Sequence, residues 1–116
     1  MSQIARVWFG RVLSSKAEEY FEYVKETGVK DLRATPGNQG VLLLQREHNG
    51  VTEFGVISFW ESRLAIEGFA GKNIEQAVYY PEDSKFLLEM EPKLLHFDVS
   101  LATGLKLTDE SLIKKE

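Results

Sequence analysis

Three side chains in the second half of the sequence are candidates for catalysis: a histidine, a tyrosine and a tryptophan. His96 lies on the polar side of an expected strand, together with Asp98 and Ser100. An ordinary imidazole pKa of about 6.5 makes it the best candidate for a general base. Asp98 lies about 7 Å further along the strand, too far for a direct catalytic pair. The alternative is that His96 is structural, at a sheet edge or a subunit contact.

Trp60 and Tyr79 are the aromatic candidates. A tryptophan at the end of a strand can form one wall of an apolar slot for a planar substrate. A tyrosine in the irregular segment before Pro81 can hydrogen-bond a substrate oxygen, and its neighbour Tyr80 is a ligand-binding candidate for the same reason. Both have structural alternatives, because Trp60 can anchor a strand to the helix after it and the tyrosines can simply fill the core.

Arg6 and Trp8 share one face of the first, central strand. A charged side chain in the middle of a sheet must be paired or lie in a cavity. Arg6 is therefore expected either to bind an anion or carboxylate or to form a structural ion pair. We count Arg6 and Trp8 among the ligand-binding residues.

Several other kinds of site are excluded or have no motif. The sequence has no cysteine, which excludes disulfides, thiolate nucleophiles and thiolate-bound metals. Its two histidines lie in separate elements, and no carboxylates have metal-ligand spacing, so we expect no metal site. No glycine-rich phosphate loop follows a strand, and no nucleophile elbow is present.

Length and composition indicate one globular domain. The 116 residues are 43% hydrophobic and 28% charged, the balance of a soluble protein rather than a disordered one. Eighteen acidic and fourteen basic residues give a net charge of −4, which argues against nonspecific nucleic-acid binding. The longest uncharged apolar run, Val41 to Leu44, is too short to span a membrane. With no secretory signal pattern, we expect a cytoplasmic protein.

The first half of the chain predicts a strand, a helix and a hairpin. Residues 4–13 are rich in β-branched and aromatic residues. Ser15 and Glu18 have capping-box spacing, and Gly28 is expected to end that helix in the left-handed conformation. Strands 41–47 and 51–60 are joined by Asn49-Gly50, the strongest short hairpin signal. This register opposes Arg46 to Glu53 and Leu42 to Ile57.

The second half predicts another helix and a last strand. Ser62 is expected to cap a helix that includes Phe69, followed by a broken helical stretch over 74–80 and a helical turn over 82–88. Residues 94–101 alternate as the last strand. The domain is expected to span residues 1–103. Residues 104–116 form a tail, which either becomes a short helix capped by Thr108 or frays.

This order of elements is the α+β, ferredoxin-like βαββαβ plan. It predicts an antiparallel sheet in the spatial order 4-1-3-2 with both helices on one face. The hairpin is apolar on both faces, so the second face requires a partner. We expect a homodimer packed sheet to sheet.

Residues 57–69, Ile-Ser-Phe-Trp-Glu-Ser-Arg-Leu-Ala-Ile-Glu-Gly-Phe, resemble the strand–Trp–x–Ser–helix–Phe signature of the antibiotic-biosynthesis-monooxygenase-like group. The resemblance extends over residues 4–101 and implies a dimeric α+β barrel. It also implies a cofactor-independent monooxygenase acting on a small aromatic or polyketide-like substrate, by deprotonation and direct reaction of the substrate anion with O2. The alternative is a non-catalytic small-ligand-binding or stress-responsive barrel of the same fold.

The haem-degrading branch of this group is similar only in outline. Its members carry an asparagine on the first strand, a tryptophan late in the helix after the third strand, and a histidine about ten residues further on. Here the first strand has no asparagine, and Phe69 and Tyr79 stand in place of the other two residues. We therefore expect no haem, and we count Phe69 among the ligand-binding residues.

Overall fold

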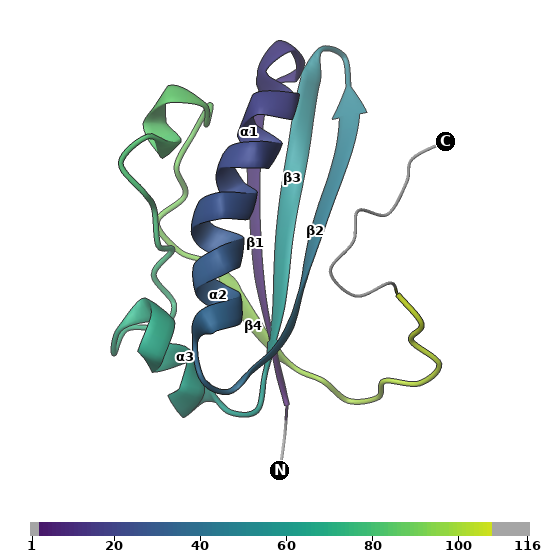
Figure 1. Ribbon diagram of the computed structural model, residues 1–116, viewed down its shortest axis with the longest axis vertical. Coiled ribbons are helices and arrows are strands. Elements are labelled where there is room, and N and C mark those ends of the chain that lie inside the picture. Colours follow the sequence, from purple (N-terminus) through teal and green to yellow (C-terminus); the bar gives the residue numbers. More distant parts are fainter. Residues whose placement is uncertain (1–2, 108–116) are drawn as a thin grey trace.

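The computed structural model describes residues 3–107. Its sheet has four strands in the order β2-β3-β1-β4, all antiparallel, which confirms the predicted topology. Helices cover one side of this sheet (Figure 1). None of the helices in the described range is long and apolar enough to cross a bilayer. The strands and helices are β1 (Ile4–Leu13), α1 (Ala17–Val24), α2 (Lys30–Ala34), β2 (Asn38–His48), β3 (Val51–Trp60), α3 (Arg63–Ala70) and β4 (Leu95–Asp98).

The hairpin of β2 and β3 forms as expected. Asn49 and Gly50 both have positive φ, at 54° and 82°, which a two-residue turn of this type requires. Arg46 pairs with Glu53, and the two side chains form an ion pair at 2.9 Å. Because side chains alternate along a strand, this register decides which residues face the helices.

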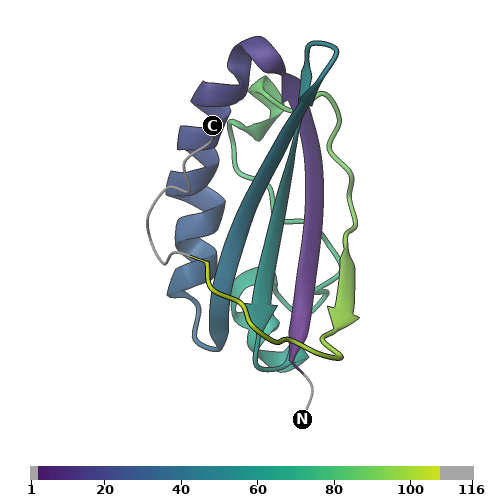
Figure 2. The same ribbon diagram turned by 90° about the vertical axis from the view of Figure 1, so that its right-hand side faces the viewer.

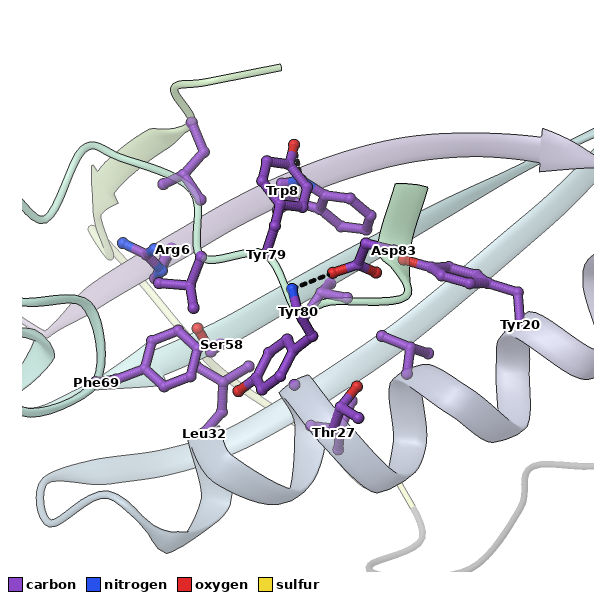
Figure 3. Close-up of a pocket in the computed structure, with 16 residues that line it drawn as sticks. Arg6, Trp8, Tyr20, Thr27, Leu32, Ser58, Phe69, Tyr79, Tyr80 and Asp83 are labelled. Atoms are coloured by element: carbon purple, nitrogen blue, oxygen red, sulfur yellow. Dashed lines mark hydrogen bonds between the residues drawn. The ribbon is translucent and has the colours of Figure 1, made fainter. Parts of the chain in front are cut away.

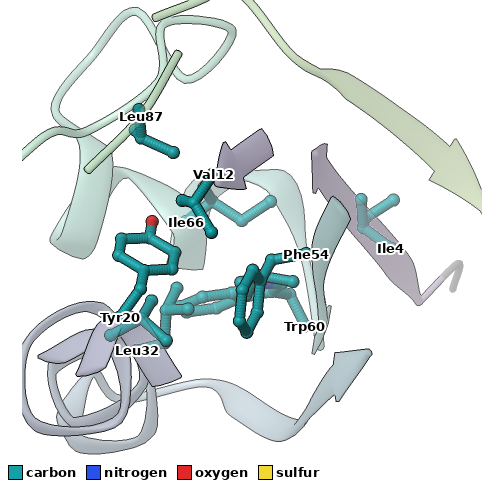
Figure 4. Close-up of a cluster of buried hydrophobic side chains, with 10 residues drawn as sticks. Ile4, Val12, Tyr20, Leu32, Phe54, Trp60, Ile66 and Leu87 are labelled. Atoms are coloured by element: carbon teal, nitrogen blue, oxygen red, sulfur yellow. The ribbon is translucent and has the colours of Figure 1, made fainter. Parts of the chain in front are cut away.

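The core lies between the covered face of the sheet and the helices (Figure 4). Trp60, Phe54 and Val12 have no exposed surface. Tyr20 packs edge-on against Phe54, with ring centroids 5.0 Å apart. The opposite face of the sheet, which we call the open face, is covered by no helix of residues 3–107, and Figure 2 shows the strands from that side.

The first helical segment differs from its prediction at both ends. Residues 14–16 form a 3-10 turn, and no side chain caps α1, so the predicted Ser15–Glu18 capping box is wrong. Gly28 does not end the helix. The chain continues through a π-helical turn, Lys25–Val29, into α2, because Leu32 continues the buried face. The helix ends only where Thr35 becomes extended.

The second half of the chain is less regular than predicted. Ser62 does cap α3, accepting a hydrogen bond from the Ala65 amide at 3.1 Å. The expected helix over 74–80 is wrong, because the segment is irregular and pairs with the chain before β4 through the bridge Gln76–Lys93. Only residues 83–85 form a 3-10 turn, and β4 is shorter than expected.

The end of the chain contains no regular structure from residue 99 to residue 107. The possible helix capped by Thr108 lies outside the described residues. The division of the chain at residue 103 stays a prediction.

Gly28 gives a direct test of the uninterrupted helix. A Cβ built there would lie 3.9 Å from both Tyr80 and Val24, an ordinary contact. We expect Gly28→Ala to raise the free energy of unfolding by about 0.4–1 kcal/mol, since alanine reduces the freedom of the unfolded chain. Chemical denaturation measures this. Gly50→Ala is the control and should destabilise, because its φ of +82° is unfavourable for alanine. Loss of stability in Gly28→Ala would contradict the described helix.

Candidate functional site

A partly open cavity of about 60 Å³ lies between the covered face of the sheet, the π-helical turn and the segment 78–83 (Figure 3). Aromatic and aliphatic side chains form most of its wall, and a few polar groups reach it. The lining residues are Arg6, Trp8, Tyr20, Val24, Thr27, Gly28, Val29, Leu32, Val56, Ser58, Phe69, Val78, Tyr79, Tyr80, Asp83 and Leu94.

The cavity depends on the alternation of β1 and on two glycines. Arg6 and Trp8 point to the covered face, and the Trp8 ring lies over Gly10, where a Cβ would come within 2.4 Å of the indole. Gly28 lies in the π-helical turn and lines the cavity without a side chain to fill it. π-Helical turns are frequent at functional sites, because the extra residue displaces the helix wall locally.

Arg6 is a buried cation, with 4% of its surface exposed. Its guanidinium donates hydrogen bonds to the backbone carbonyls of Ile74 and Gln76, the latter at 3.2 Å, and lies 5.7 Å from the centroid of the Phe69 ring. No carboxylate of residues 3–107 lies within ion-pair distance of it. Burial lowers the pKa of Arg6 to about 10. We expected Arg6 either to bind an anion or to form a structural ion pair. Among residues 3–107 the ion pair is not present.

His96 lies opposite Arg6 in the β1–β4 register, and its Nε2 is 3.0 Å from the guanidinium. Because arginine only donates, Nε2 accepts this bond and the ring proton resides on Nδ1. Burial, followed by the positive charges of Arg6 and Arg63, lowers the pKa of His96 to about 4. The expected titration near neutral pH is thus wrong. His96 does not line the cavity but holds the residue that does.

Tyr79 and Trp8 are joined at the cavity wall. The indole N–H of Trp8 donates to the Tyr79 hydroxyl at 3.1 Å, and that hydroxyl donates to the carbonyl of Glu91 at 2.6 Å. Burial raises the pKa of Tyr79. At neutral pH Tyr79 is therefore an oriented, uncharged hydroxyl rather than a base.

Trp60 lies in the core, outside the cavity lining. Its indole N–H donates to the Ser58 hydroxyl at 2.8 Å, and Ser58 lines the cavity. This position fits the structural alternative for Trp60, in which it packs in the core rather than against a substrate. Trp60 can affect a ligand only through Ser58.

Asp83 is the cavity residue that sequence reasoning missed. Its side chain is buried, with 5% of the residue exposed, and it accepts a hydrogen bond from the Tyr80 amide at 2.6 Å. Burial raises the pKa of this carboxyl. An aspartate after Pro81-Glu82 has the pattern of an exposed turn, and the only signal in the sequence is the pair of tyrosines directly before that turn.

A second, open depression of about 350 Å³ adjoins the cavity. Phe69 and Tyr80 line both, so these two side chains stand between the inner cavity and the depression. The Tyr80 hydroxyl donates to Asp31 at 2.6 Å, which ties the tyrosine to α2. The depression is lined by Asp31, Ala34, Thr35, Pro36, Gly68, Phe69 and Tyr80.

Five of the seven candidate residues thus meet at one cavity: Arg6, Trp8, Phe69, Tyr79 and Tyr80. The other two, Trp60 and His96, lie one residue further from it and contact Ser58 and Arg6. Within residues 3–107, no group of three or more histidine or acidic side chains is placed to hold a metal ion.

Known proteins resemble this chain in structure but not detectably in sequence. No family model matches it, and no curated protein matches it. A Bacillus cereus protein provisionally classed as an antibiotic biosynthesis monooxygenase superposes with a TM-score of 0.61 at 15% identity, over 90% of this chain and 100% of that one. A Nitrosomonas europaea protein classed in the same way gives 0.61 at 19% identity, over 89% and 94%.

A haem degrader of Mycobacterium tuberculosis, solved with two haems in its active site, gives a TM-score of 0.55 at 21% identity, over 87% of this chain and 99% of that one. At these identities the likeness concerns the fold. The expected resemblance to antibiotic-biosynthesis-monooxygenase-like proteins is thereby confirmed for the fold.

The Arg6–His96 contact predicts a pH dependence of stability. Between pH 6.5 and pH 4 the unfolded chain protonates His96 while the folded chain does not, so the free energy of unfolding falls as the pH falls. His96→Gln should show a smaller loss of melting temperature over this range than wild type. The control is His48→Gln at the exposed hairpin turn, which should behave as wild type. Equal slopes for all three proteins would contradict the buried neutral imidazole.

Proposed function

We propose that this chain is a cofactor-independent monooxygenase that acts on a small aromatic or polyketide-like substrate. The observation that carries the proposal is Arg6, a buried cation with no carboxylate partner in residues 3–107, at the wall of an aromatic-lined cavity. The fold shared with proteins classed as antibiotic biosynthesis monooxygenases supports it. A desolvated guanidinium is suited to stabilise an oxyanion.

The proposed reaction begins with removal of the proton from a substrate phenol. Charge spreads from the oxygen to a ring carbon that carries hydrogen, and O2 adds to this carbon to form a hydroperoxide. Loss of water then leaves a second carbonyl, so that the phenol and O2 yield a quinone and one H2O. Four electrons leave the substrate and four reduce O2, so the balance needs no other reductant. Arg6 stabilises the anion on which this sequence depends.

In this proposal the remaining candidates orient the substrate. Trp8 and Phe69 form flat walls, and Tyr79 presents a fixed hydroxyl. His96 is a positioning residue, because it accepts a hydrogen bond from Arg6. Trp60 positions the Ser58 hydroxyl, to which its indole N–H donates a hydrogen bond.

The size of the cavity bears on how a substrate enters. Pockets for organic ligands of drug size occupy roughly 300–1,000 Å³, whereas the inner cavity is about 60 Å³. An aromatic substrate therefore requires Phe69 or Tyr80 to turn aside, which joins the cavity to the outer depression.

A haem does not fit the described site. The imidazole nearest the cavity, His96, accepts a hydrogen bond from Arg6 through Nε2 and does not line the cavity. The cavity volume of about 60 Å³ is also far below that of a porphyrin.

The test is oxygen uptake with a panel of hydroxyquinones and polycyclic phenols. We expect one O2 consumed per substrate, without hydrogen peroxide. Arg6→Met should weaken binding of the substrate anion about tenfold or more, the usual scale for one lost hydrogen bond to a charged group. Arg33→Met is the control, since Arg33 is an exposed arginine of α2 that does not line the cavity and donates to the Asn38 side chain at 2.9 Å.

Near-ultraviolet circular dichroism checks that Arg6→Met remains folded, and Arg6→Lys, which keeps the charge, should bind better than Arg6→Met. Binding without oxygen uptake across the panel would favour the non-catalytic ligand-binding alternative. Equal affinities in wild type and Arg6→Met would contradict the role given to Arg6.

We also propose that the protein is a homodimer through its open face. Large apolar side chains there remain in water in the single chain, among them Phe9 at 50% and Phe97 at 51% exposed. Because these side chains are already half buried, each costs roughly half of the 1.5–3 kcal/mol that full exposure would cost, about 1 kcal/mol. A second copy of the same sheet covers both patches in one symmetric contact. The exposed members of this face are Phe9, Leu13, Leu44, Leu95 and Phe97.

A charge placed on the open face should break the dimer. We expect Phe97→Asp to sediment as a monomer at micromolar concentration and to melt at a lower temperature than wild type. Wild type should melt at a temperature that rises with protein concentration, because association stabilises the folded state. Leu64→Asp is the control, since Leu64 is also exposed but lies on α3. A monomeric wild type would overturn the proposal.

A further inference from the structure

We propose that Asp83 is the proton acceptor of the cavity. Together with Arg6 it selects planar ligands that carry a hydroxyl at one end and a conjugated carbonyl at the other. This deepens the proposed function, since it uses the same cavity, but it concerns recognition and proton transfer and holds whether or not O2 reacts.

The two charged groups of the cavity lie apart from each other. Arg6 comes from β1 and Asp83 from the 3-10 turn that follows Pro81, and Figure 3 shows them on opposite sides of the group of lining residues. They are not within ion-pair distance. A cavity with a cation at one side and a carboxyl at the other has a fixed polarity, and a ligand of matching polarity is favoured in it.

The carboxyl of Asp83 is not neutralised by a cation of the described residues. No lysine or arginine of residues 3–107 pairs with it. One of its oxygens accepts a hydrogen bond from the Tyr80 amide, and the carboxyl also interacts with the buried hydroxyl of Tyr20. The hydrogen bond to Tyr80 stabilises the local turn, and the contact with Tyr20 ties the carboxyl to α1. The same carboxyl, 5% exposed, also lines the cavity, where a ligand can reach it.

Burial makes this carboxylate a better proton acceptor than an exposed one. The low polarity of its surroundings raises the pKa of Asp83, while the backbone amide of Tyr80 and the hydroxyl of Tyr20 oppose that shift. The other titratable groups near the cavity are poor bases at neutral pH. Burial raises the pKa of Tyr79, and His96 is engaged with Arg6.

The polarity of the cavity specifies the ligand. A hydroxyl facing Asp83 transfers its proton to the carboxylate, and in a conjugated ligand the negative charge then spreads to the carbonyl oxygen facing Arg6. The proton moves from the ligand oxygen to the Asp83 carboxylate, which becomes neutral. The negative charge is then on the ligand, at the oxygen that faces Arg6. Trp8, Phe69 and Tyr80 around the cavity favour a planar ring between the two groups.

The test compares 4-hydroxyacetophenone with 4-methoxyacetophenone, which differ only in the hydroxyl proton donor. Titration calorimetry at neutral pH should show that wild type binds the hydroxy compound about tenfold more tightly, the usual scale for a hydrogen bond to a charged group. In Asp83→Asn this preference should fall to about threefold or less. Asparagine keeps an acceptor for the Tyr80 amide, so the turn should persist. Glu82→Gln, an exposed neighbour, should keep the full preference.

The absorption spectrum gives a second readout that needs no variant. Bound to wild type, 4-hydroxyacetophenone should absorb as its phenolate at a pH where the free compound is still neutral. Bound neutral phenol, no preference for the hydroxyl, no binding of either compound, or a preference retained in Asp83→Asn would each overturn the proposal. If the preference is present but no phenol of the panel consumes O2, the proposed oxygenase function fails while this inference stands.

Discussion

A guanidinium buried beneath the helices is the constraint on which the site depends. Arg6 lies on the central strand, and desolvation of its charge must be offset by hydrogen bonds from its surroundings. The carbonyls of Ile74 and Gln76 provide two of these bonds, and His96 provides a third. With these carbonyls turned toward Arg6, residues 74–80 are irregular and do not form the expected helix.

The irregular segment in turn shapes the cavity. Because the irregular chain between α3 and β4 passes over the covered face, it brings Tyr79, Tyr80 and Asp83 to the cavity that Arg6 also lines. On the opposite wall, the π-helical turn places Gly28 where a side chain would otherwise fill the space. The cavity thus exists between two local departures from regular helix, and both contribute residues to its lining.

The sheet separates the two functions that we propose for the protein, ligand binding and dimerisation. Its covered face holds the core and the charged cavity, whereas its open face carries exposed apolar side chains such as Phe9 and Phe97. Strand alternation makes this separation possible, because neighbouring residues point to opposite faces. Arg6 and Val7 are adjacent in sequence, yet one contributes to the cavity and the other to the open face. A substitution on either face can therefore be interpreted separately from the other.

The sequence by itself determined the strand order, the hairpin register and the faces of each strand, because alternation, Asn49-Gly50 and the capping Ser62 are local signals. It also singled out Arg6 as a charge that required a partner or a cavity. It did not determine whether Arg6 has a charged partner or lies in a cavity. Nor did it determine that residues 74–80 are irregular or that Asp83 is buried, since all three depend on groups distant in the chain. Only the tertiary structure placed His96 and two backbone carbonyls around Arg6, and the resulting desolvation moved the pKa of His96 away from its ordinary value.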